Sequence, residues 1–369
     1  MKYYLTVIFL FLMTVQFSHA QKLYGARSGS EYGFVDITGN WIIPAKYRKV
    51  DIFSEGLARV LVGVEWGYIN EKGEMVIPAK FEKTKNFIDG KAQVKVGGLY
   101  GMVDKKGEWV IKPEFSHVEI FVDGIALAKK AGDWGFIDEK GEWKIQPNFD
   151  GLKEFSEGLA QAKSKNLWGY VNGSGAWVIP PSYPRAEKFC DGLARVKIEA
   201  GWFFIDKEKK RIDPKLYESA RDYEDGVARV KRSGKWGLID KTGAWIIEPT
   251  LENVEEFVGG LARAKSDGRW GFINGKGEWI IKPTLDGLKD FSEGLAQAKK
   301  QDLWGYINER GEWVIKPRFE STKKFVEGNA IVREIDSWGI IDKSGEYTAI
   351  PKFQELRSLE DDELFTAFN

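Results

Sequence analysis

The chain has 369 residues, with 14% aromatic residues, 15 Trp and a formal net charge of zero. This apolar content excludes a disordered chain, and the balanced charge argues against nucleic acid as a partner. Two His and one Cys leave too few ligands for a zinc or copper site and no pair for an internal disulfide. We therefore expect no metal and no cofactor.

Residues 1–20 predict a secretory signal peptide. Lys2 precedes the apolar run YYLTVIFLFLMTVQF, and Ser18 and Ala20 place small residues at the −3 and −1 positions of a cut before Gln21. A membrane anchor is the alternative, but the run is short for a span and no basic stop-transfer segment follows it. Removing residues 1–20 takes away one lysine and no acid, which leaves a net charge of −1. We expect an exported protein (periplasmic, cell-surface or secreted) with no membrane span in the mature chain.

The rest of the chain, residues 21–369, is a single array of ten repeats, and the repeat begins again at every 34th position without a slip. The repeats start at the residue before a recurrent glycine, at Tyr32, Trp66, Tyr100, Trp134, Trp168, Trp202, Trp236, Trp270, Trp304 and Trp338, and the last one acts as a cap. A second Trp usually follows later in the repeat, as Trp313 follows Trp304.

A longer period of four repeats is also present. The segments 150–171 and 286–307 occupy the same place in repeats that stand four apart, and they are identical at 17 of 22 positions. This identity indicates duplication of a four-repeat block.

The first half of each repeat predicts a β-hairpin. Asn or Asp begins the turn in all ten repeats, as Asn70 does, and Gly73 supplies the left-handed conformation at its end. Pairing across the turn sets Ile69 opposite Met75 and Gly67 opposite Ile77. A Trp at the Met75 position would then lie diagonally over the glycine of its partner strand.

Repeat 6 departs from this pattern. Phe203 replaces the glycine of the Trp-Gly pair, and Arg211 occupies the second Trp position. The loss of both residues in the same repeat is consistent with a glycine that makes room for the indole of the second Trp.

The second half of the repeat is less regular. Proline is expected to end the second strand. Phe81, Thr84 and Phe87 then predict a short 3₁₀ turn or an irregular strand. Asp89-Gly90 predicts a two-residue turn, and a last strand follows with Ala92 inward. We expect an all-β tandem array of hairpin or meander repeats stacked on one another. An open superhelical β-solenoid is favoured, and a closed β-propeller-like array is the alternative.

The pattern W-G-[FY]-[IV]-[ND]-x-x-G-x-W-[IV]-I, followed by Pro, Phe, Phe, acid-Gly and Ala, resembles the WG-repeat (KWG-type) family of bacterial proteins. The resemblance covers residues 32–369. It implies a β-rich array with a binding role and supplies no catalytic residues. The residues to which the pattern assigns structural roles are Trp66, Gly67, Gly73, Trp134, Trp168, Trp236, Trp270, Trp304, Gly305 and Trp313.

Candidate chemistry is sparse, and we expect no catalytic residues and no enzyme. Acids precede the turn glycines, as at Glu55 and Glu293, where turn geometry explains them better than an active site does. Basic residues recur at equal phase on the last strand of the repeat, and period two puts them on one face. They form a candidate binding stripe of Lys129, Lys163, Lys197, Lys231, Lys265, Lys299, Arg195, Arg229 and Arg263.

The function favoured by the sequence is a non-enzymatic exported repeat protein that presents an extended surface to a protein or polymer. Carbohydrate or cell-wall binding through aromatic grooves between repeats is the alternative, and a glycan-processing enzyme is a third. The expected partner is a protein, an anionic polymer or a glycan.

Overall fold

The computed structural model describes residues 23–36 and 40–353, so the expected signal peptide, residues 1–20, lies outside the described part. Every regular element there is a β-strand. The strands form ten sheets, eight of four strands and two of three, and none of them closes into a barrel. The described residues up to 113 and those from 114 onward form two compact units. The expected all-β tandem array is confirmed.

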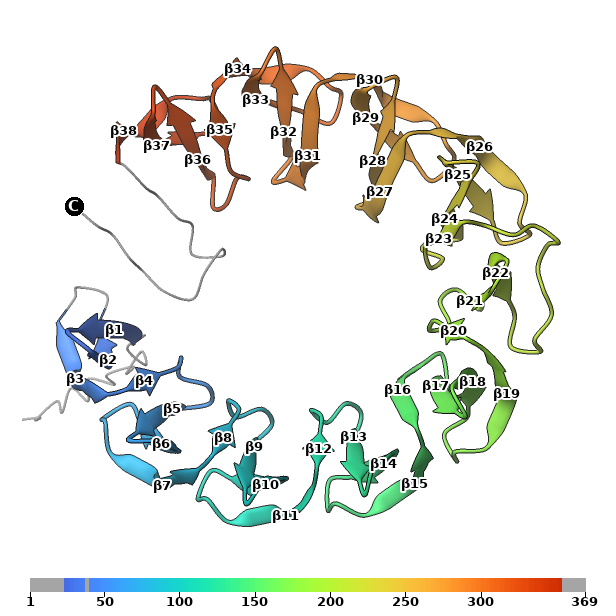
Figure 1. The fold of residues 1–369 in the computed structure, drawn as a ribbon. Helices are drawn as coiled ribbons and strands as arrows, with labels where there is room; N and C mark the ends of the chain where they lie inside the picture. The colour runs from blue at the N-terminus through green and yellow to red at the C-terminus, as the bar shows by residue number, and fades with distance from the viewer. Residues whose placement is uncertain (1–22, 37–39, 354–369) are drawn as a thin grey trace, which may run out of the picture. The chain divides into compact units, whose positions relative to one another are not determined.

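Each complete sheet contains four antiparallel strands in chain order, labelled in Figure 1. The first strand has two residues in β4 (Lys49–Val50), β8 (Lys83–Thr84), β12 (His117–Val118), β20 (Arg185–Ala186), β23 (Ser219–Ala220) and β35 (Ser321–Thr322). It is longer in β16 (Gly151–Ser156), β27 (Asn253–Val258) and β31 (Gly287–Ser292). The second strand comprises β1 (Tyr24–Ser28), β5 (Leu57–Val62), β9 (Lys91–Val96), β13 (Ile125–Lys130), β17 (Leu159–Ser164), β21 (Ala194–Ile198), β24 (Val227–Arg232), β28 (Leu261–Ser266), β32 (Leu295–Lys300) and β36 (Asn329–Glu334).

The third strand carries the Trp-Gly pair and is called the Trp-Gly strand. It comprises β2 (Glu31–Val35), β6 (Glu65–Asn70), β10 (Leu99–Asp104), β14 (Asp133–Asp138), β18 (Leu167–Val171), β22 (Gly201–Ile205), β25 (Lys235–Asp240), β29 (Arg269–Asn274), β33 (Leu303–Ile307) and β37 (Ser337–Asp342). The fourth, or outer, strand comprises β3 (Trp41–Tyr47), β7 (Met75–Phe81), β11 (Trp109–Phe115), β15 (Trp143–Phe149), β19 (Trp177–Tyr183), β26 (Trp245–Leu251), β30 (Trp279–Leu285), β34 (Trp313–Phe319) and β38 (Tyr347–Phe353).

The sequence repeat and the sheet are out of phase. A repeat that begins at Trp66 supplies the Trp-Gly strand and outer strand of one sheet, β6 and β7, and then the first two strands of the next, β8 and β9. The segment around Thr84 is therefore an irregular strand rather than a 3₁₀ turn. Each repeat is thus shared between two successive sheets.

The predicted turn between the Trp-Gly strand and the outer strand is confirmed. In repeat 2 the Gly73 amide donates to the Asn70 carbonyl at 2.9 Å, and the Asn70 amide donates to the Glu74 carbonyl at 3.0 Å. Asn70 Oδ1 also accepts from the amides of Lys72 and Glu74. Gly73 has a φ of 80°, so the glycine satisfies a left-handed position.

The expected pairing of Gly67 with Ile77 is wrong. Ile69 does lie opposite Met75, but a bulge places Tyr68 opposite Ile77 and Trp66 opposite Phe81. Gly67 therefore faces the bulged backbone of β7, where a Cβ would lie 2.7 Å from the amide nitrogen of Ala79. Among the described glycines of the Trp-Gly pairs, an indole is one of the three nearest neighbours only at Gly135, from Trp143. Close backbone approach is the main reason for this glycine.

The outer strand also continues past the proline, which was expected to end it. β7 runs through Pro78 to Phe81, and β34 runs through Pro317 to Phe319. The outer strand lies at a sheet edge, where no neighbour needs the missing proline N–H. Proline at one edge and a first strand of two residues at the other both discourage edge-to-edge pairing.

The core lies between successive sheets. In the first unit, Leu57, Tyr68, Ile77 and Phe81 of sheet β4–β7 pack against Phe87, Ala92, Val94 and Val103 of the following sheet. The second Trp contributes to the same kind of contact. Trp177 lies edge-to-face on Phe149 of the preceding outer strand, with ring centroids 5.5 Å apart. Stacking of neighbours thus buries the faces that one sheet leaves open.

Repeat 6 has lost its outer strand. Sheet β20–β22 has three strands, and residues 211–217 contribute only isolated bridges, from Arg211 to Ile205 and from Tyr217 to Trp202. Phe203 occupies the glycine position and is buried against Tyr183, with ring centroids 6.0 Å apart. A side chain at this position fills the space that the outer strand needs in the other sheets.

Candidate functional site

The column of Arg and Gln on the second strands holds successive sheets together. Each side chain reaches the carbonyl of a residue in the first strand of the next sheet. Gln161 Nε2 donates to the Ala186 carbonyl at 3.0 Å, and Arg263 Nη1 donates to the Leu288 carbonyl at 3.0 Å. Arg195 and Arg229 make the equivalent bonds to Ala220 and Val254. The Arg members of the predicted stripe are therefore part of the inter-sheet packing.

The lysines of the stripe lie beside the Trp-Gly indoles. Each lies opposite the Trp in the register of its sheet, as Lys231 lies opposite Trp236 and Lys299 opposite Trp304. Four of the ammonium groups are placed over the ring, at 5.4 to 6.0 Å from its centroid: Lys129 on Trp134, Lys163 on Trp168, Lys197 on Trp202 and Lys265 on Trp270. These are cation–π distances. The stripe as a binding surface stays a prediction, and most of its charges already have local contacts.

The acid-Gly turns form a second set of contacts between sheets. Glu293 accepts a hydrogen bond from the amide of Gly328 in the next repeat, and pairs with Lys343 Nζ at 3.0 Å. Glu55 makes the same contacts with Gly90 and Lys105. The hydrogen bond from Lys343 holds the pKa of Glu293 below its usual value, and Lys105 does the same for Glu55. The sequence indicated the turn but not this link, which requires the neighbouring repeat.

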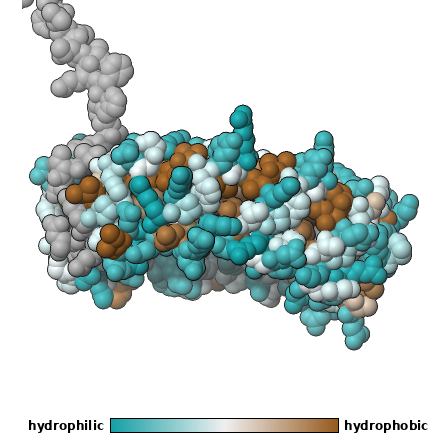
Figure 2. All heavy atoms as spheres, turned by 90° about the horizontal axis from the view of Figure 1, so that it is seen from above, coloured by the Kyte–Doolittle hydropathy of each residue, from teal (hydrophilic) through white to brown (hydrophobic). Residues whose placement is uncertain are grey.

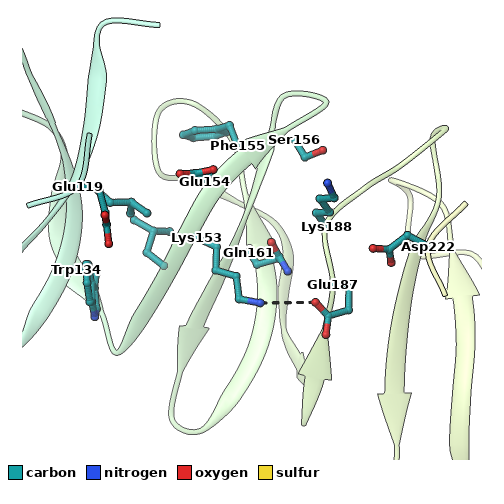
Figure 3. Close-up of a pocket in the computed structure, with 12 residues that line it drawn as sticks. Glu119, Trp134, Lys153, Glu154, Phe155, Ser156, Gln161, Glu187, Lys188 and Asp222 are labelled. Carbon is teal, nitrogen blue, oxygen red and sulfur yellow. Dashed lines mark ion pairs between the residues drawn. The ribbon is translucent and has the colours of Figure 1, made fainter. Parts of the chain in front are cut away.

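A hollow of about 500 Å³, called hollow A, opens in the second unit beside the first strand β16. Twelve residues from successive sheets line it: Glu119, Leu127, Trp134, Leu152, Lys153, Glu154, Phe155, Ser156, Gln161, Glu187, Lys188 and Asp222. Figure 3 shows Lys153 and Glu187 pointing toward each other across it, with their charged atoms 3.6 Å apart. Trp134 and Glu119 lie on one side of this pair and Asp222 on the other.

A smaller hollow of about 320 Å³, called hollow B, lies beside β31. It is lined by Lys289, Asp290, Phe291, Ser292, Gln297, Lys323 and Lys324. Each of these residues stands four repeats after a residue that lines hollow A, as Lys289 stands after Lys153. Each copy of the duplicated block therefore carries an equivalent hollow.

Both hollows lie beside a longer first strand that opens with glycine, whereas the equally long β27 opens with Asn253. β16 and β31 each have six residues, and a register shift follows Leu152 and Leu288. Glycine opens both strands, and the indole of the same sheet lies against it: a Cβ on Gly151 would lie 3.2 Å from Trp168, and one on Gly287 would lie 3.1 Å from Trp304. Both copies of the duplicated segment contain the motif DGLK, but the motif alone did not predict a hollow.

Most charged groups around hollow A already have partners. Asp222 pairs with Arg195 Nε at 2.6 Å, and Glu119 lies 2.6 Å from His117 Nε2. Lys153 and Glu187 pair with each other. Glu154 is exposed at the rim. This arrangement suits recognition of a polar group better than proton transfer, because most of its carboxylates lie close to a basic partner.

Aromatic exposure is uneven along the chain. Trp-Gly indoles are partly buried, apart from the buried Trp202. Outer strands carry part of the exposed large apolar residues, at Trp41, Ile42, Met75, Val76 and Trp109 in the first unit and at Val178, Ile280 and Val314 in the second. On the face seen in Figure 2, apolar patches are separated by hydrophilic side chains. Among the described residues, no helix is long and apolar enough to cross a bilayer.

Fold and site together define an all-β tandem-repeat protein. Its sequence matches the family described as WG containing repeat nine times, over residues 32–63, 66–100, 100–132, 134–168, 168–202, 202–236, 236–270, 270–304 and 304–334. The chain belongs to this family, as its Trp-Gly pattern indicated.

Solved structures resemble the chain only distantly, and no curated protein matches it in sequence. A crystal structure of a eukaryotic initiation factor is 12% identical, with 92% of this chain and 98% of that one covered and a TM-score of 0.43. PorZ, a surface component of the type-IX secretion system of Porphyromonas gingivalis, is 10% identical, with coverage of 90% and 59% and a TM-score of 0.27. Hsv2p of Kluyveromyces lactis is 9% identical, with coverage of 72% and 95% and a TM-score of 0.27.

Proposed function

We propose that this chain is an exported, non-enzymatic binding protein that recognises a protein partner through the first-strand edge of its second unit. Hollow A and hollow B are the places where side chains of the partner insert. The observation that carries the proposal is the recurrence of one hollow, lined at seven equivalent positions, in both copies of the duplicated block. Packing alone does not require an open hollow at these positions, because most other sheets have a two-residue first strand there.

The edges of the sheets support side-chain recognition rather than strand addition. A partner that adds a strand needs a free, regular sheet edge. The outer strands carry proline, most first strands have two residues, and the six-residue β16, β27 and β31 are interrupted by a register shift. Neither edge therefore offers a long, regular ladder of backbone groups. Hollows between sheets remain as the sites of specific contact.

Site-specific photo-crosslinking tests the proposal. A photoreactive phenylalanine analogue would replace Phe155 in one mature protein and Phe291 in another, with exposed Val314 on an outer strand as the control position. We expect crosslinks to the same partner from both hollows and none from the control. Crosslinks from the control alone would rule out the first-strand edge. Export is tested by recovering the mature chain, without residues 1–20, outside the cytoplasm.

Carbohydrate binding is a second candidate, favoured by one observation: the partly exposed Trp134 lines hollow A beside Gln161 and several carboxylates. Aromatic and polar groups together suit a sugar ring. However, the Lys129 ammonium already lies 5.4 Å from the Trp134 ring centroid, and the His117 ring packs edge-on at 5.3 Å. Titration with cell-wall oligosaccharides, compared between the mature protein and Trp134→Ala, would establish this candidate if binding depends on Trp134. Release of reducing sugar by the unmodified protein would instead indicate the enzyme.

A further inference from the structure

The outer strands of the first unit leave large apolar side chains open to solvent. Trp41 and Ile42 of β3, Met75 and Val76 of β7 and Trp109 of β11 each have between 37% and 43% of their surface exposed. The three strands are the outer strands of successive sheets, and Figure 1 shows them following one another along one rim of this unit. The five side chains therefore recur along that rim and are called the outer apolar row.

An exposed lysine stands on each of the same three strands, at Lys46, Lys80 and Lys112. The Lys46 ammonium lies 5.3 Å from the ring centroid of Tyr47, and the Lys80 ammonium lies 5.4 Å from that of Phe81. These rings position the lysines but carry no charge. Within the described part of the chain, none of the three lysines forms an ion pair. Their charges are therefore available to an anionic partner.

The positive charge is concentrated in the first unit. Residues 40–113 contain 13 Lys and Arg against 9 Asp and Glu, whereas residues 114–353 contain 38 against 39. The segments 41–47, 75–81 and 109–113 of the outer strands contain no acid. The acids next to them, Glu74 and Glu108, belong to the turns before β7 and β11, and Glu74 already accepts from Asn70 Nδ2 at 2.7 Å. The rim thus combines exposed apolar groups with a positive surplus.

We propose that the outer strands of the first unit dock the protein on a lipid surface that carries anionic headgroups. Exposed aromatic and aliphatic side chains would enter the boundary between headgroups and acyl chains, where indole rings are favoured. The lysine stems are long enough to place their ammonium groups among the lipid phosphates. This inference goes beyond the proposed function, because it concerns another unit and does not involve hollow A or hollow B.

A lipid surface fits this rim better than an added β-strand does. Pro44 and Pro78 stand within the exposed strands β3 and β7, and proline has no N–H to offer to a new strand. A fluid headgroup layer needs no backbone partner. It can also accommodate apolar and basic groups that alternate from strand to strand, because phosphates and acyl chains rearrange around them.

The test measures co-sedimentation of the mature protein with vesicles of phosphatidylcholine mixed with phosphatidylglycerol, and with vesicles of phosphatidylcholine alone. We expect binding to the anionic vesicles and much weaker binding to the neutral ones. A triple variant, Lys46→Gln with Lys80→Gln and Lys112→Gln, should lower the partition coefficient about tenfold or more at low salt. The effect should be much smaller at about 0.5 M salt, where the attraction is screened.

The apolar contribution is tested with the double variant Ile42→Ser and Val76→Ser. It should weaken binding by a similar factor at low and at high salt, because burial of apolar surface is not screened. This difference in salt dependence separates the two contributions. Far-UV circular dichroism and thermal unfolding verify that each variant is folded.

The matched control removes three exposed lysines from the second unit, by Lys235→Gln, Lys282→Gln and Lys316→Gln. Lys282 and Lys316 stand on the outer strands β30 and β34, and the control loses the same total charge. Its binding should stay within twofold of the unmodified protein. Equal weakening by the two triple variants would overturn the assignment to the first unit.

Three other outcomes would also overturn the proposal. Equal binding to neutral and anionic vesicles would remove the role of the lysines. Binding to neither kind of vesicle would reject the lipid surface, and the proposed function would still stand if crosslinks from positions 155 and 291 persist. Self-association that is lost in the Ile42→Ser and Val76→Ser variant, without vesicle binding, would show that a second copy of the chain covers the outer apolar row.

Discussion

The glycine of the Trp-Gly pair is needed mainly because the backbone of the outer strand comes close to it, and less because of the indole. In repeat 5, a Cβ on Gly169 would lie 2.7 Å from the carbonyl carbon of Pro180 and 2.8 Å from the nitrogen of Pro181. These are backbone atoms of the bulged outer strand, which cannot rotate away as a side chain can. The Trp beside the glycine is partly buried and packs on the core between sheets.

We expect Gly169→Ala to lower the free energy of unfolding by about 1–3 kcal/mol, because the outer strand must shift to accept the methyl group. Gly173→Ala is the matched control in the same repeat, since a Cβ there meets nothing within 4 Å. The control should remain within about 0.5 kcal/mol of the unmodified protein. Urea unfolding of the two variants measures the difference. Equal stability of both would show that the strand is not constrained at this point.

The turn acids should give the protein a pH-dependent stability. The pKa of Glu293 is lowered from 4.5 by the hydrogen bond from Lys343. A carboxyl with a lowered pKa in the folded state stabilises the fold above its unfolded pKa, and loses that effect as the pH falls through the folded pKa. Glu293→Gln should therefore be less stable than the unmodified protein at pH 7, and the difference should vanish in acid. Thermal unfolding at pH 7 and pH 3 checks this, and a difference that persists at pH 3 would contradict it.

At the scale of the element, repeat 6 shows that the outer strand is absent where the glycine is replaced. Phe203 and the missing outer strand occur in the same sheet. The Phe203 ring is buried and Arg211 lies over it, with its guanidinium carbon 4.3 Å from the ring centroid. The divergent sheet has thus been repacked around the larger side chain.

Replacing Phe203 by the glycine that the other repeats have at this position should therefore destabilise the protein. We expect Phe203→Gly to cost about 3–5 kcal/mol of unfolding free energy, as for other buried aromatic residues removed from a core. Chemical denaturation followed by tryptophan fluorescence measures the change. A stabilised variant would mean that the outer strand reforms as soon as the glycine is restored.

Local patterns predicted the strands and turns well because they are set within a few residues. The Asn70–Gly73 turn and the inward Ala92 are as expected. The bulge that moves Tyr68 opposite Ile77 could not be predicted, because an alternating pattern assumes a regular ladder. The role of Arg263 was missed for a related reason: its carbonyl partner lies in another sheet, far along the chain. The hollows likewise depend on the packing of successive sheets.

At the scale of the whole molecule, each sheet is stabilised by its neighbours in the chain. The contacts of Gln161, Glu293 and the core residues all join one sheet to the next. Stability of such an array is close to a sum of repeat and nearest-neighbour terms. A destabilising substitution in one sheet should therefore lower the stability of that sheet and its neighbours more than that of distant sheets.

Hydrogen exchange followed by mass spectrometry tests this locality with Gly169→Ala. We expect faster exchange in β16–β19 and in the adjoining sheets β12–β15 and β20–β22, whereas exchange in residues 40–113 should not change. Uniform acceleration along the chain would show that the array unfolds as a single cooperative body.

The phase difference between repeat and sheet also affects how such a chain can be rearranged. Because every sheet takes its strands from two repeats, inserting or deleting any whole number of repeat lengths, at any point, leaves all the joined sheets complete. A recombination event therefore has to preserve only the length of the repeat and does not have to fall at a domain boundary. The repeats that carry hollows A and B stand four repeat lengths apart, as such a copying event would leave them, and the hollows differ in the sign of a charge at one shared position, Glu187 or Lys323. New ligand preferences can then arise without a new fold.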